Sequence, residues 1–527
     1  MMLAAAAIEH CLALGVREFV ICAGSRNSPL ILQAASAADV PGLRLWHFFE
    51  ERSAGFFALG RTRDTSRPVA VLTTSGTAAA ELLPSVIEAH YQGLPLMVVT
   101  ADRPRRYRGS GAPQAIEQER LFGVYAEFVD AAVTDDLKAM PRPQRSLHLN
   151  VCLEEPDSET PRKMTAPPPG LEAPPTAVDS SEAVGRFLRE PSGLLVLLGE
   201  LLPHERDWVR CLLEQLPGVA VWAEAASGLR QWLADRDGEG GVFLILGGDA
   251  TLRHLPVRKV LRLGGVPSCR FWRDLESQPE IPVLSLTRSG HRGLARSCDV
   301  HPLTSVGIGS IPCGDLRDPF RRQDREMELA ALVEAFPGSE CAQLRQISRL
   351  MPAESGLFLG NSLTIRQWNL AALPHAEQRC QVLRGANGID GNLSCFFGCH
   401  ADAPESWAIV GDLTALYDLS APWVLPQLAA GRRRIVVLNN GGGRIFSRLP
   451  SLQGIGAGER TLIENPHALR FAAWAEMWNL SYVRIEAGSQ WAAALPECPV
   501  VIELLPDAAQ SDAFWRQLAV REKEVWG

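Results

Sequence analysis

The stretch VGDLTALYDL (410–419), followed by VVLNNGGGRIF (436–446), decides the fold predicted for this chain. Each segment continues an apolar run into polar or glycine residues, a pattern that predicts a buried strand ending in a turn. Asp412 and Asn440 lie 28 positions apart, enough for one strand–helix–strand crossover. Ligands of open parallel sheets bind beyond the carboxyl ends of the strands, so we expect these two side chains to lie close together at such a site.

The chemistry of these two strand ends suits a metal ion and a phosphate group. Carboxylate, amide and backbone carbonyl oxygens are hard ligands that Mg²⁺ accepts, alongside phosphate oxygens and water. The glycines at 441–443 would let the backbone approach a diphosphate closely. The alternative is that Gly-Asp and Asn-Gly are ordinary turn sequences. The order and spacing of the two motifs favour the metal and diphosphate interpretation.

A second polar cluster, FFEERSAGFFALG (48–60), follows another apolar run. Glu50 and Glu51 end a predicted strand and precede a helix whose first turn has small residues. A carboxylate at a helix N-terminus is a common cap, and we assign this role to Glu50. We expect Glu51 to be desolvated by the neighbouring Phe residues, which raises the pKa of a carboxyl toward that of a useful general acid or base.

Short apolar runs alternate with helical patterns along the whole chain, which predicts an α/β fold with mostly parallel sheets covered by helices on both faces. The stretch 154–181 is rich in Pro, Ser and Thr without periodicity, and is predicted to be a linker. Since 527 residues are too many for one hydrophobic core, we predict three domains, at 1–153, 182–337 and 338–527.

The apolar runs also give the individual strands of each domain. The predicted strands are 18–24, 68–76 and 95–104 in the first domain, 193–199, 219–225, 242–248 and 281–287 in the second, and 356–362, 381–388, 407–412, 434–440 and 498–505 in the third. Helices are predicted at 77–91 and 318–336.

Composition is that of an ordinary soluble globular protein, with 46% hydrophobic and 21% charged residues. The net charge of -8 disfavours nucleic acid as a partner. Twelve Cys without regular spacing indicate reduced thiols, and the N-terminal stretch 1–15 is typical of a helix rather than a signal peptide. The longest apolar stretch, 193–202, is too short to span a bilayer. We therefore predict a cytoplasmic protein without an integral membrane segment.

Together these motifs resemble thiamine-diphosphate-dependent enzymes, in particular the 2-succinyl-5-enolpyruvyl-6-hydroxy-3-cyclohexene-1-carboxylate synthase family of menaquinone and phylloquinone biosynthesis. The resembling motifs, in chain order, are CAGSRNSPL (22–30), FEERSAGFFALG (49–60), TSGTAAAELLPSVIEA (74–89), TADRP (100–104), GAPQAIEQERLFG (111–123), GNSLTIR (360–366), RGANGIDG (384–391), GDLTALYDL (411–419) and NNGGGRIFSRLP (439–450). Leu413 stands where the generic thiamine signature has a second Gly, as is usual in this family.

The resemblance implies thiamine diphosphate and Mg²⁺ (or Mn²⁺) as cofactors. Glu51 matches the family's catalytic glutamate, which hydrogen-bonds the aminopyrimidine ring of the cofactor. Asp412, Asn440 and the Gly442 carbonyl match the metal ligands, and Ile389 matches the residue that holds the cofactor in a bent shape. Further implied cofactor contacts are Ser75, Gly411, Leu413, Thr414, Gly443, Ile445 and Phe446.

The implied activity is that of a transferase. It decarboxylates 2-oxoglutarate and adds the resulting succinyl semialdehyde carbanion to isochorismate in a 1,4-addition, giving the family's product and CO₂. Each substrate has two carboxylates, which guanidinium groups bind bidentately. The matching substrate positions are Ser25, Arg26, Arg103, Gln114, Arg270, Ser362, Arg366, Arg384, Ile445, Phe446 and Leu449. Cys269 aligns with a Lys of the family and Arg270 is adjacent, so the resemblance leaves this contact open.

The resemblance also implies a homodimer with active sites that cross between subunits, alone or as a dimer of dimers. The residues disfavour three other functions. Arg103, Arg366 and Arg384 disfavour another thiamine-dependent 2-oxoacid decarboxylase or carboligase, since pyruvate-type substrates need fewer cations. Retention of Glu51 and Asp412 disfavours a non-catalytic protein of the same fold. A nicotinamide-dependent oxidoreductase is disfavoured because no Gly-x-Gly-x-x-Gly follows the first strand.

Overall fold

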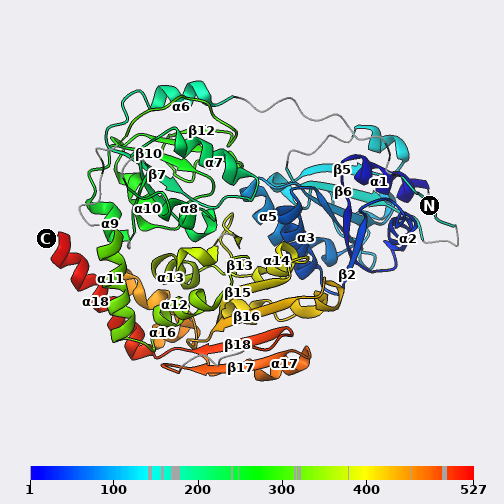
Figure 1. The fold of residues 1–527 in the computed structure, drawn as a ribbon. Coiled ribbons are helices and arrows are strands. Elements are labelled where there is room, and N and C mark those ends of the chain that lie inside the picture. Colours follow the sequence, from blue (N-terminus) through cyan, green and yellow to red (C-terminus); the bar gives the residue numbers. More distant parts are fainter. Residues whose placement is uncertain are drawn as a thin grey trace. The chain divides into compact units, whose positions relative to one another are not determined.

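The structure, a computed structural model, describes residues 2–139, 145–155, 160–166, 168, 179–238, 241–246, 249–313, 316, 322–377, 379–452, 454–489 and 495–526. The chain forms two compact units, each of which is described by itself. The first comprises Met1–Thr176, Gly385–Asp402 and Asp418–Ala429, and the second comprises Ala177–Arg384, Ala403–Tyr417 and Ala430–Gly527. Figure 1 shows their elements, coloured along the sequence.

The first unit is built on a six-stranded parallel sheet of order β2-β1-β3-β4-β6-β5. Its strands are β1 (Glu18–Cys22), β2 (Arg44–Phe48), β3 (Val69–Thr73), β4 (Leu96–Asp102), β5 (Glu127–Ala131) and β6 (Leu147–Cys152). Its helices are α1 (Met2–Ala13), α2 (Ser28–Ser36), α3 (Glu51–Thr65), α4 (Thr77–Ala80), α5 (Leu83–Gln92) and α14 (Asn392–Cys399).

Helices cover both faces of this sheet (Figure 1). Side chains of α1 and α2 share a hydrophobic core with one set of alternating strand residues, among them Phe19 and Ile21. On the other face, α3 packs against β3 and crosses α14 at close range. A Cβ atom at Gly60 would lie 2.3 Å from the Cys395 carbonyl oxygen, so only glycine permits this crossing. This contact joins the segment 385–402 to the first unit.

The second unit contains two further six-stranded parallel sheets, of order β12-β11-β10-β7-β8-β9 and β14-β13-β15-β16-β18-β17. The first of these has β7 (Leu194–Leu198), β8 (Ala220–Ala223), β9 (Phe243–Leu244), β10 (Lys259–Leu263), β11 (Val283–Leu286) and β12 (Asp299–His301). The second has β13 (Gly356–Leu359), β14 (Cys380–Val382), β15 (Glu405–Gly411), β16 (Arg432–Leu438), β17 (Ser481–Glu486) and β18 (Val500–Leu505).

The helices of the second unit are α6 (Ser181–Phe187), α7 (Glu205–Glu214), α8 (Arg230–Ala234), α9 (Asp249–His254), α10 (Arg270–Asp274), α11 (Arg322–Ala335), α12 (Glu340–Leu350), α13 (Leu363–Ala371), α15 (Asp412–Tyr417), α16 (Ala457–Glu464), α17 (Ala472–Met477) and α18 (Ala508–Trp526). Each sheet has its own hydrophobic core, and short turns of 3₁₀ helix connect several elements.

The predicted α/β class and the three mostly parallel sheets are confirmed. Some element boundaries were wrong. The predicted helix 77–91 is two helices, α4 and α5, because Pro84 lies in the first turn of α5 and cannot continue a helix from before it. The predicted strand 381–388 ends at Val382, ahead of two glycines. Strand β9 covers only Phe243–Leu244 of the predicted strand 242–248, whose last two residues lie outside the described residues.

The predicted domain boundaries stay predictions. Most of the predicted linker, at 156–159, 167 and 169–178, lies outside the described residues. Its remaining residues form neither helix nor strand until α6 begins at Ser181.

Candidate active site

The predicted site residues of the first unit follow adjacent strands of its sheet. Glu51 begins α3 three residues beyond the last residue of β2, while Arg26, Ser75 and Arg103 follow β1, β3 and β4. These four strands are consecutive in the order β2-β1-β3-β4, so their carboxyl ends form one continuous edge. The parallel sheet thus gathers residues that lie far apart in the sequence, as expected for a ligand site.

Glu50 and Glu51 have different roles in this edge. Glu50 is the N-cap of α3, and its carboxylate accepts hydrogen bonds from the backbone N–H groups of Arg52 at 2.9 Å and Ser53 at 3.1 Å. The capping interpretation of Glu50 is therefore confirmed. Ser53 and Ser420 also donate hydroxyl hydrogen bonds to this carboxylate. Glu50 stabilises the start of α3 and so fixes the position from which Glu51 projects.

Glu51 is half-buried and has few hydrogen-bond donors. The Thr73 hydroxyl donates to its Oε1 at 3.4 Å. Burial raises the pKa of Glu51 above its ordinary value, and the neighbouring charge of Glu50 acts in the same direction. Of the two flanking Phe residues, Phe48 is buried but Phe49 is 58% exposed, so only one of them excludes water as predicted. A carboxyl of raised pKa at a strand end suits proton exchange with a bound group.

Gln114 and Ser75 are brought together by an unusual backbone turn. Gly76 has φ +88°, and a Cβ atom there would lie 3.3 Å from the Gln114 Cα. Gln114 itself has φ +57°, which is uncommon for a residue with a side chain. The buried Gln118 joins the two segments, because its Oε1 accepts a hydrogen bond from the Gly76 N–H at 2.9 Å. Ser25 lies in the turn after β1, next to Arg26.

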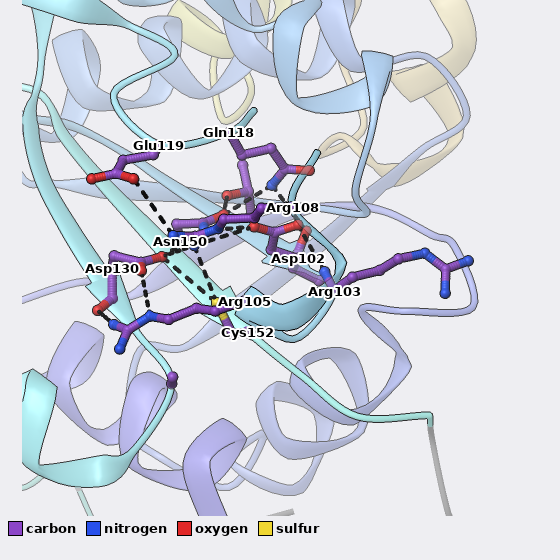
Figure 2. Close-up of polar contacts among 12 residues, drawn as sticks. Asp102, Arg103, Arg105, Arg108, Gln118, Glu119, Asp130, Asn150 and Cys152 are labelled. Carbon is purple, nitrogen blue, oxygen red and sulfur yellow. Dashed lines mark hydrogen bonds and ion pairs between the residues drawn. The ribbon is translucent and has the colours of Figure 1, made fainter. Parts of the chain in front are cut away.

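A polar network gathers around Asp130, close in sequence and space to the segment that carries Arg103 (Figure 2). Asp130 accepts hydrogen bonds from Arg105 Nε at 2.8 Å, Arg108 Nη2 at 2.6 Å and Asn150 Nδ2 at 2.8 Å. Asn150 Nδ2 also donates to Asp102 at 3.0 Å. These donors lower the pKa of Asp130 against the effect of its burial. The network fastens the loop after β4 to β5 and β6.

The sequence reasoning did not identify this network. Its only local signal was the run of arginines in DRPRRYRG (102–109), since Asp130 and Asn150 come from other strands. In Figure 2, Arg105 and Arg108 turn toward Asp130, whereas the side chain of Arg103 extends away from the network. The guanidinium of Arg103 therefore lies outside the network around Asp130.

The second unit repeats the same arrangement in its last sheet. Ser362, Arg384, Asp412 and Asn440 follow β13, β14, β15 and β16, which are consecutive in the order β14-β13-β15-β16. Asp412 begins α15 directly after β15, and Asn440 follows β16 in the neighbouring position. The prediction that these two side chains follow adjacent strands is therefore confirmed.

Asp412 is buried and accepts three backbone hydrogen bonds. Its Oδ2 accepts from the N–H groups of Gly441 at 2.8 Å and Gly442 at 2.9 Å, and its Oδ1 accepts from Leu413 at 2.6 Å. His467 Nε2 lies 3.3 Å from Oδ2. Burial raises the pKa of Asp412, and the backbone donors act against this rise. Asp412 thereby ties the glycine loop after β16 to the end of β15.

Asn440 supplies a direct test of whether a metal ion fits. Its Nδ2 donates to Glu340 at 2.6 Å, which fixes the amide orientation, while its Oδ1 is buried and has no hydrogen-bond partner among the described residues. Such an orphaned oxygen is costly unless a ligand or water satisfies it. The Asp412 carboxylate, the Asn440 amide oxygen and the Gly442 carbonyl are hard ligands of the kind that suits Mg²⁺. No three His, Cys, Asp or Glu side chains gather into a metal cluster within the described ranges.

The glycine loop adopts conformations that require glycine. Gly441 has φ +76° and Gly442 has φ +134°. A Cβ atom at Gly442 would lie 2.7 Å from the Glu464 carbonyl oxygen. Gly443 donates its backbone N–H to that same carbonyl. The loop is thus a close-packed bend in which Gly441, Gly442 and Gly443 each donate the backbone N–H to another group of the chain.

The arginines of the second unit share a buried acidic neighbour, Glu224, that the sequence reasoning missed. Arg384 is 8% exposed, and its Nε has no hydrogen-bond partner among the described residues. Glu224, just beyond β8, is fully buried, and burial raises its pKa against the opposing charges of Arg384 and Arg366. Its Oε1 accepts from the Ser268 N–H at 2.5 Å. Arg366, on α13, donates to the Ser362 carbonyl.

The structure describes the surroundings of Cys269 and Arg270, the two residues at the position where the family has a substrate-contacting Lys. Arg270 begins α10, is exposed, and its Nε donates to Asp274 at 2.8 Å. Cys269 is 5% exposed. The guanidinium of Arg270 is therefore engaged along its own helix, which weakens its assignment as a substrate contact.

Apolar candidates surround the glycine loop and the segment 385–402. Phe446 and Leu449 are exposed, at 37% and 39%, and Ile445 and Ile389 are half-buried. Among the neighbours of Asp412, Thr414 is buried, while Gly411 and Leu413 are half-buried. Exposed apolar side chains beside a polar strand end are typical of an incomplete ligand pocket or an interface.

The first unit matches a known family model, described as the thiamine pyrophosphate enzyme, N-terminal TPP binding domain, over residues 1–121. That match and the strand-end carboxylates, amide and glycines define the chain as a thiamine-diphosphate enzyme. The chain is 41% identical to the 2-succinyl-5-enolpyruvyl-6-hydroxy-3-cyclohexene-1-carboxylate synthase of Akkermansia muciniphila, over 97% of each chain. It is 37% identical to the enzyme of the same name from Bdellovibrio bacteriovorus, over 99% of each chain.

A third relative of that name, from a Synechococcus species, is 34% identical over 85% of this chain and 83% of the relative. The chain belongs to the 2-succinyl-5-enolpyruvyl-6-hydroxy-3-cyclohexene-1-carboxylate synthase family.

Within the described part of the chain, none of the helices combines the length and apolar character needed to cross a bilayer.

Proposed function

We propose that the chain converts 2-oxoglutarate and isochorismate into 2-succinyl-5-enolpyruvyl-6-hydroxy-3-cyclohexene-1-carboxylate and CO₂, a step of menaquinone biosynthesis. The observation that carries the proposal is Glu51, a half-buried carboxyl of raised pKa at a strand end of the thiamine-binding domain. The family to which the chain belongs bears the name of this activity. Bound thiamine diphosphate supplies the electron sink that the loss of CO₂ requires.

The residues of the chain would hold this cofactor from two sides. Glu51 would hydrogen-bond the pyrimidine ring and hold or release a proton at its carboxyl. Asp412, Asn440 and the Gly442 carbonyl would hold Mg²⁺, or Mn²⁺, and the glycine loop would hold the diphosphate. The unpartnered Asn440 Oδ1 supports the metal assignment. The half-buried Ile389 would support the centre of the cofactor.

The arginines account for the choice of substrates. Both substrates carry two carboxylates, and guanidinium groups keep their charge at any working pH. Arg26 and Arg103 in the first unit, and Arg366 and Arg384 in the second, would bind these groups. A protein of net charge -8 can in this way hold strongly anionic substrates.

One assay tests the proposal. The chain is incubated with thiamine diphosphate, Mg²⁺, 2-oxoglutarate and isochorismate, and the products are identified by mass spectrometry. We expect CO₂ and the family's product. Turnover of pyruvate at a higher kcat/KM than 2-oxoglutarate would instead indicate another thiamine-dependent decarboxylase or carboligase.

We further propose that the active chain is a homodimer, alone or within a tetramer, with sites that cross between subunits. Glu51 and Asp412 lie in different units, and each would contact an opposite end of one cofactor. The test mixes and refolds two inactive variants, Glu51→Ala and Asp412→Ala. With random reassortment half the dimers are mixed and about a quarter of all sites regain both residues. If the two residues met within one chain, every site would keep one defect and no activity would return.

A further inference from the structure

The carboxylate of Glu155 pairs with two guanidinium groups of the first unit, those of Arg26 and Arg103. No substrate or cofactor role has been assigned to Glu155. Glu155 forms an ion pair with Arg26 through its Oε1 and the Arg26 Nη2. The same oxygen lies 3.7 Å from Arg103 Nη1. Arg26 follows β1 and Arg103 follows β4, so Glu155 links the two strand ends from a third segment, just beyond β6. We propose that Glu155 is a positioning residue that holds Arg26 and Arg103 in place for a substrate carboxylate.

Arg26 needs such a partner because it is nearly buried. Its side chain is 8% exposed, and its other terminal nitrogen, Nη1, donates to the Leu153 carbonyl at 3.2 Å. A buried guanidinium without a carboxylate is strongly destabilising, whereas one that is paired and hydrogen-bonded is tolerated. Glu155 is 76% exposed and therefore supplies this charge without a large desolvation cost of its own.

Arg103 is held at several points that leave its guanidinium directed at the same carboxylate. Its backbone N–H donates to Asp102 at 2.7 Å and its Nε donates to the Pro113 carbonyl at 3.1 Å. Its guanidinium lies 5.3 Å from the ring centroid of Tyr107, within range of a cation–π interaction. Figure 2 shows this side chain extending away from the network around Asp130.

Two guanidinium groups close enough to bind one substrate repel each other. Without an intervening anion, this repulsion favours rotamers that separate them. Glu155 lies against both and offsets the repulsion before the substrate arrives. Pre-ordering of two long side chains reduces the entropy that binding would otherwise cost.

The adjacent residue offers a matched control. Glu154 forms a bidentate ion pair with Arg106, with both N–O distances at 2.6 Å, and it is 68% exposed. Arg106 also lies 5.2 Å from the Tyr107 centroid. Glu154 therefore resembles Glu155 in charge, exposure and pairing with arginine, but its partner is not one of the proposed substrate contacts.

The inference rests on the proposed function, and the experiment separates the two. Glu155→Gln, Glu155→Asp and Glu154→Gln are assayed with 2-oxoglutarate and isochorismate varied in turn, and the melting temperature of each variant is measured. We expect Glu155→Gln to raise the KM of one substrate tenfold or more, with a smaller change in kcat. Glu155→Asp should recover part of the loss, and Glu154→Gln should keep the wild-type KM values.

Three outcomes would overturn the inference. If the KM of both substrates falls in Glu155→Gln, this carboxylate competes with the substrate for the arginines. If Glu155→Gln and Glu154→Gln behave alike, Glu155 is an ordinary surface ion pair. If Glu155→Gln lowers the melting temperature and kcat while both KM values stay constant, its role is structural. A wild-type protein that forms no product would contradict the proposed function instead.

Discussion

Each unit places a carboxylate just beyond the end of a strand, Glu51 after an edge strand and Asp412 after an inner strand, and the two are surrounded differently. Glu51 follows β2 in the first unit and Asp412 follows β15 in the second. Asp412 is saturated with donors, since three backbone N–H groups contact it within 2.9 Å. Glu51 has one side-chain donor among the described residues, the Thr73 hydroxyl at 3.4 Å, and is only half-buried.

This difference separates two kinds of chemistry. Backbone donors are present at every pH and favour the charged carboxylate, which suits a residue that must remain an anion and a ligand. Burial raises the pKa of both carboxyls, but Glu51 has fewer donors to hold it in the charged form, which suits a group that exchanges a proton. The same strand-end geometry thus serves two functions, depending on how many N–H groups face the side chain.

The largest expected effect is on turnover at Glu51. Glu51→Gln keeps the shape and the hydrogen bonding of the side chain but removes the exchangeable proton. We expect kcat to fall by about 10²–10⁴-fold, the usual contribution of a general acid or base. Thermal stabilisation by thiamine diphosphate plus Mg²⁺ should persist. Glu50→Gln is the comparison, since it removes one acceptor of the helix cap and should lower the melting temperature with a much smaller loss of kcat.

The second effect concerns ligand binding at Asp412. Asp412→Ala should abolish the rise in melting temperature that thiamine diphosphate and Mg²⁺ produce in the wild type. For a ligand at 100 times its dissociation constant, this stabilisation is about 2.7 kcal/mol. Circular dichroism of the variant without ligands checks that it is folded. An undiminished rise would show that the Asp412 and Asn440 interpretation is wrong.

A smaller effect is expected at the arginines of the second unit. Arg366→Ala or Arg384→Ala removes a carboxylate clamp, which costs about 2–5 kcal/mol where the partner charge stays desolvated. We expect kcat/KM for a dicarboxylate substrate to fall at least tenfold, since about 1.4 kcal/mol corresponds to a factor of ten. Arg432→Ala is a suitable control, because Arg432 pairs with Glu405 and Glu497 at 42% side-chain exposure. Equal kinetics in all three variants would remove both arginines from the site.

The smallest effect is the pH dependence of stability at Glu51. The fold raises the pKa of Glu51 above 4.5, so the folded state binds this proton more tightly than the unfolded state. The stability that protonated Glu51 contributes is fully present below the unfolded pKa and is lost as the pH rises through the folded pKa. Glu51→Gln does not ionise and should melt at a higher temperature than the wild type at neutral pH. Melting curves between pH 4 and 8 should show this difference vanishing at the acid end.

Much of the site was predictable because its signals are local. Apolar runs that end in Gly-Asp or Asn-Asn-Gly-Gly-Gly specify buried strands and their turns, and glycine conformation is a property of one residue. The alternation of strands and helices predicts parallel sheets, whose carboxyl ends gather such turns at one edge. The sequence by itself therefore determined the α/β class, the strand-end position of Asp412 and Asn440, and the N-cap role of Glu50.

The tertiary structure decided which groups are satisfied and which are not. Arg108 and Asn150 meet at Asp130 from separate segments, and Glu155 reaches Arg26 across 129 positions of the chain. Within the described part of the chain, Asn440 Oδ1 is left without a partner because Glu340 engages only the other end of its amide. Burial, and with it each shift in pKa, depends on which distant segments exclude water from a side chain. Such long-range pairings have no local pattern, so only the folded chain reveals them.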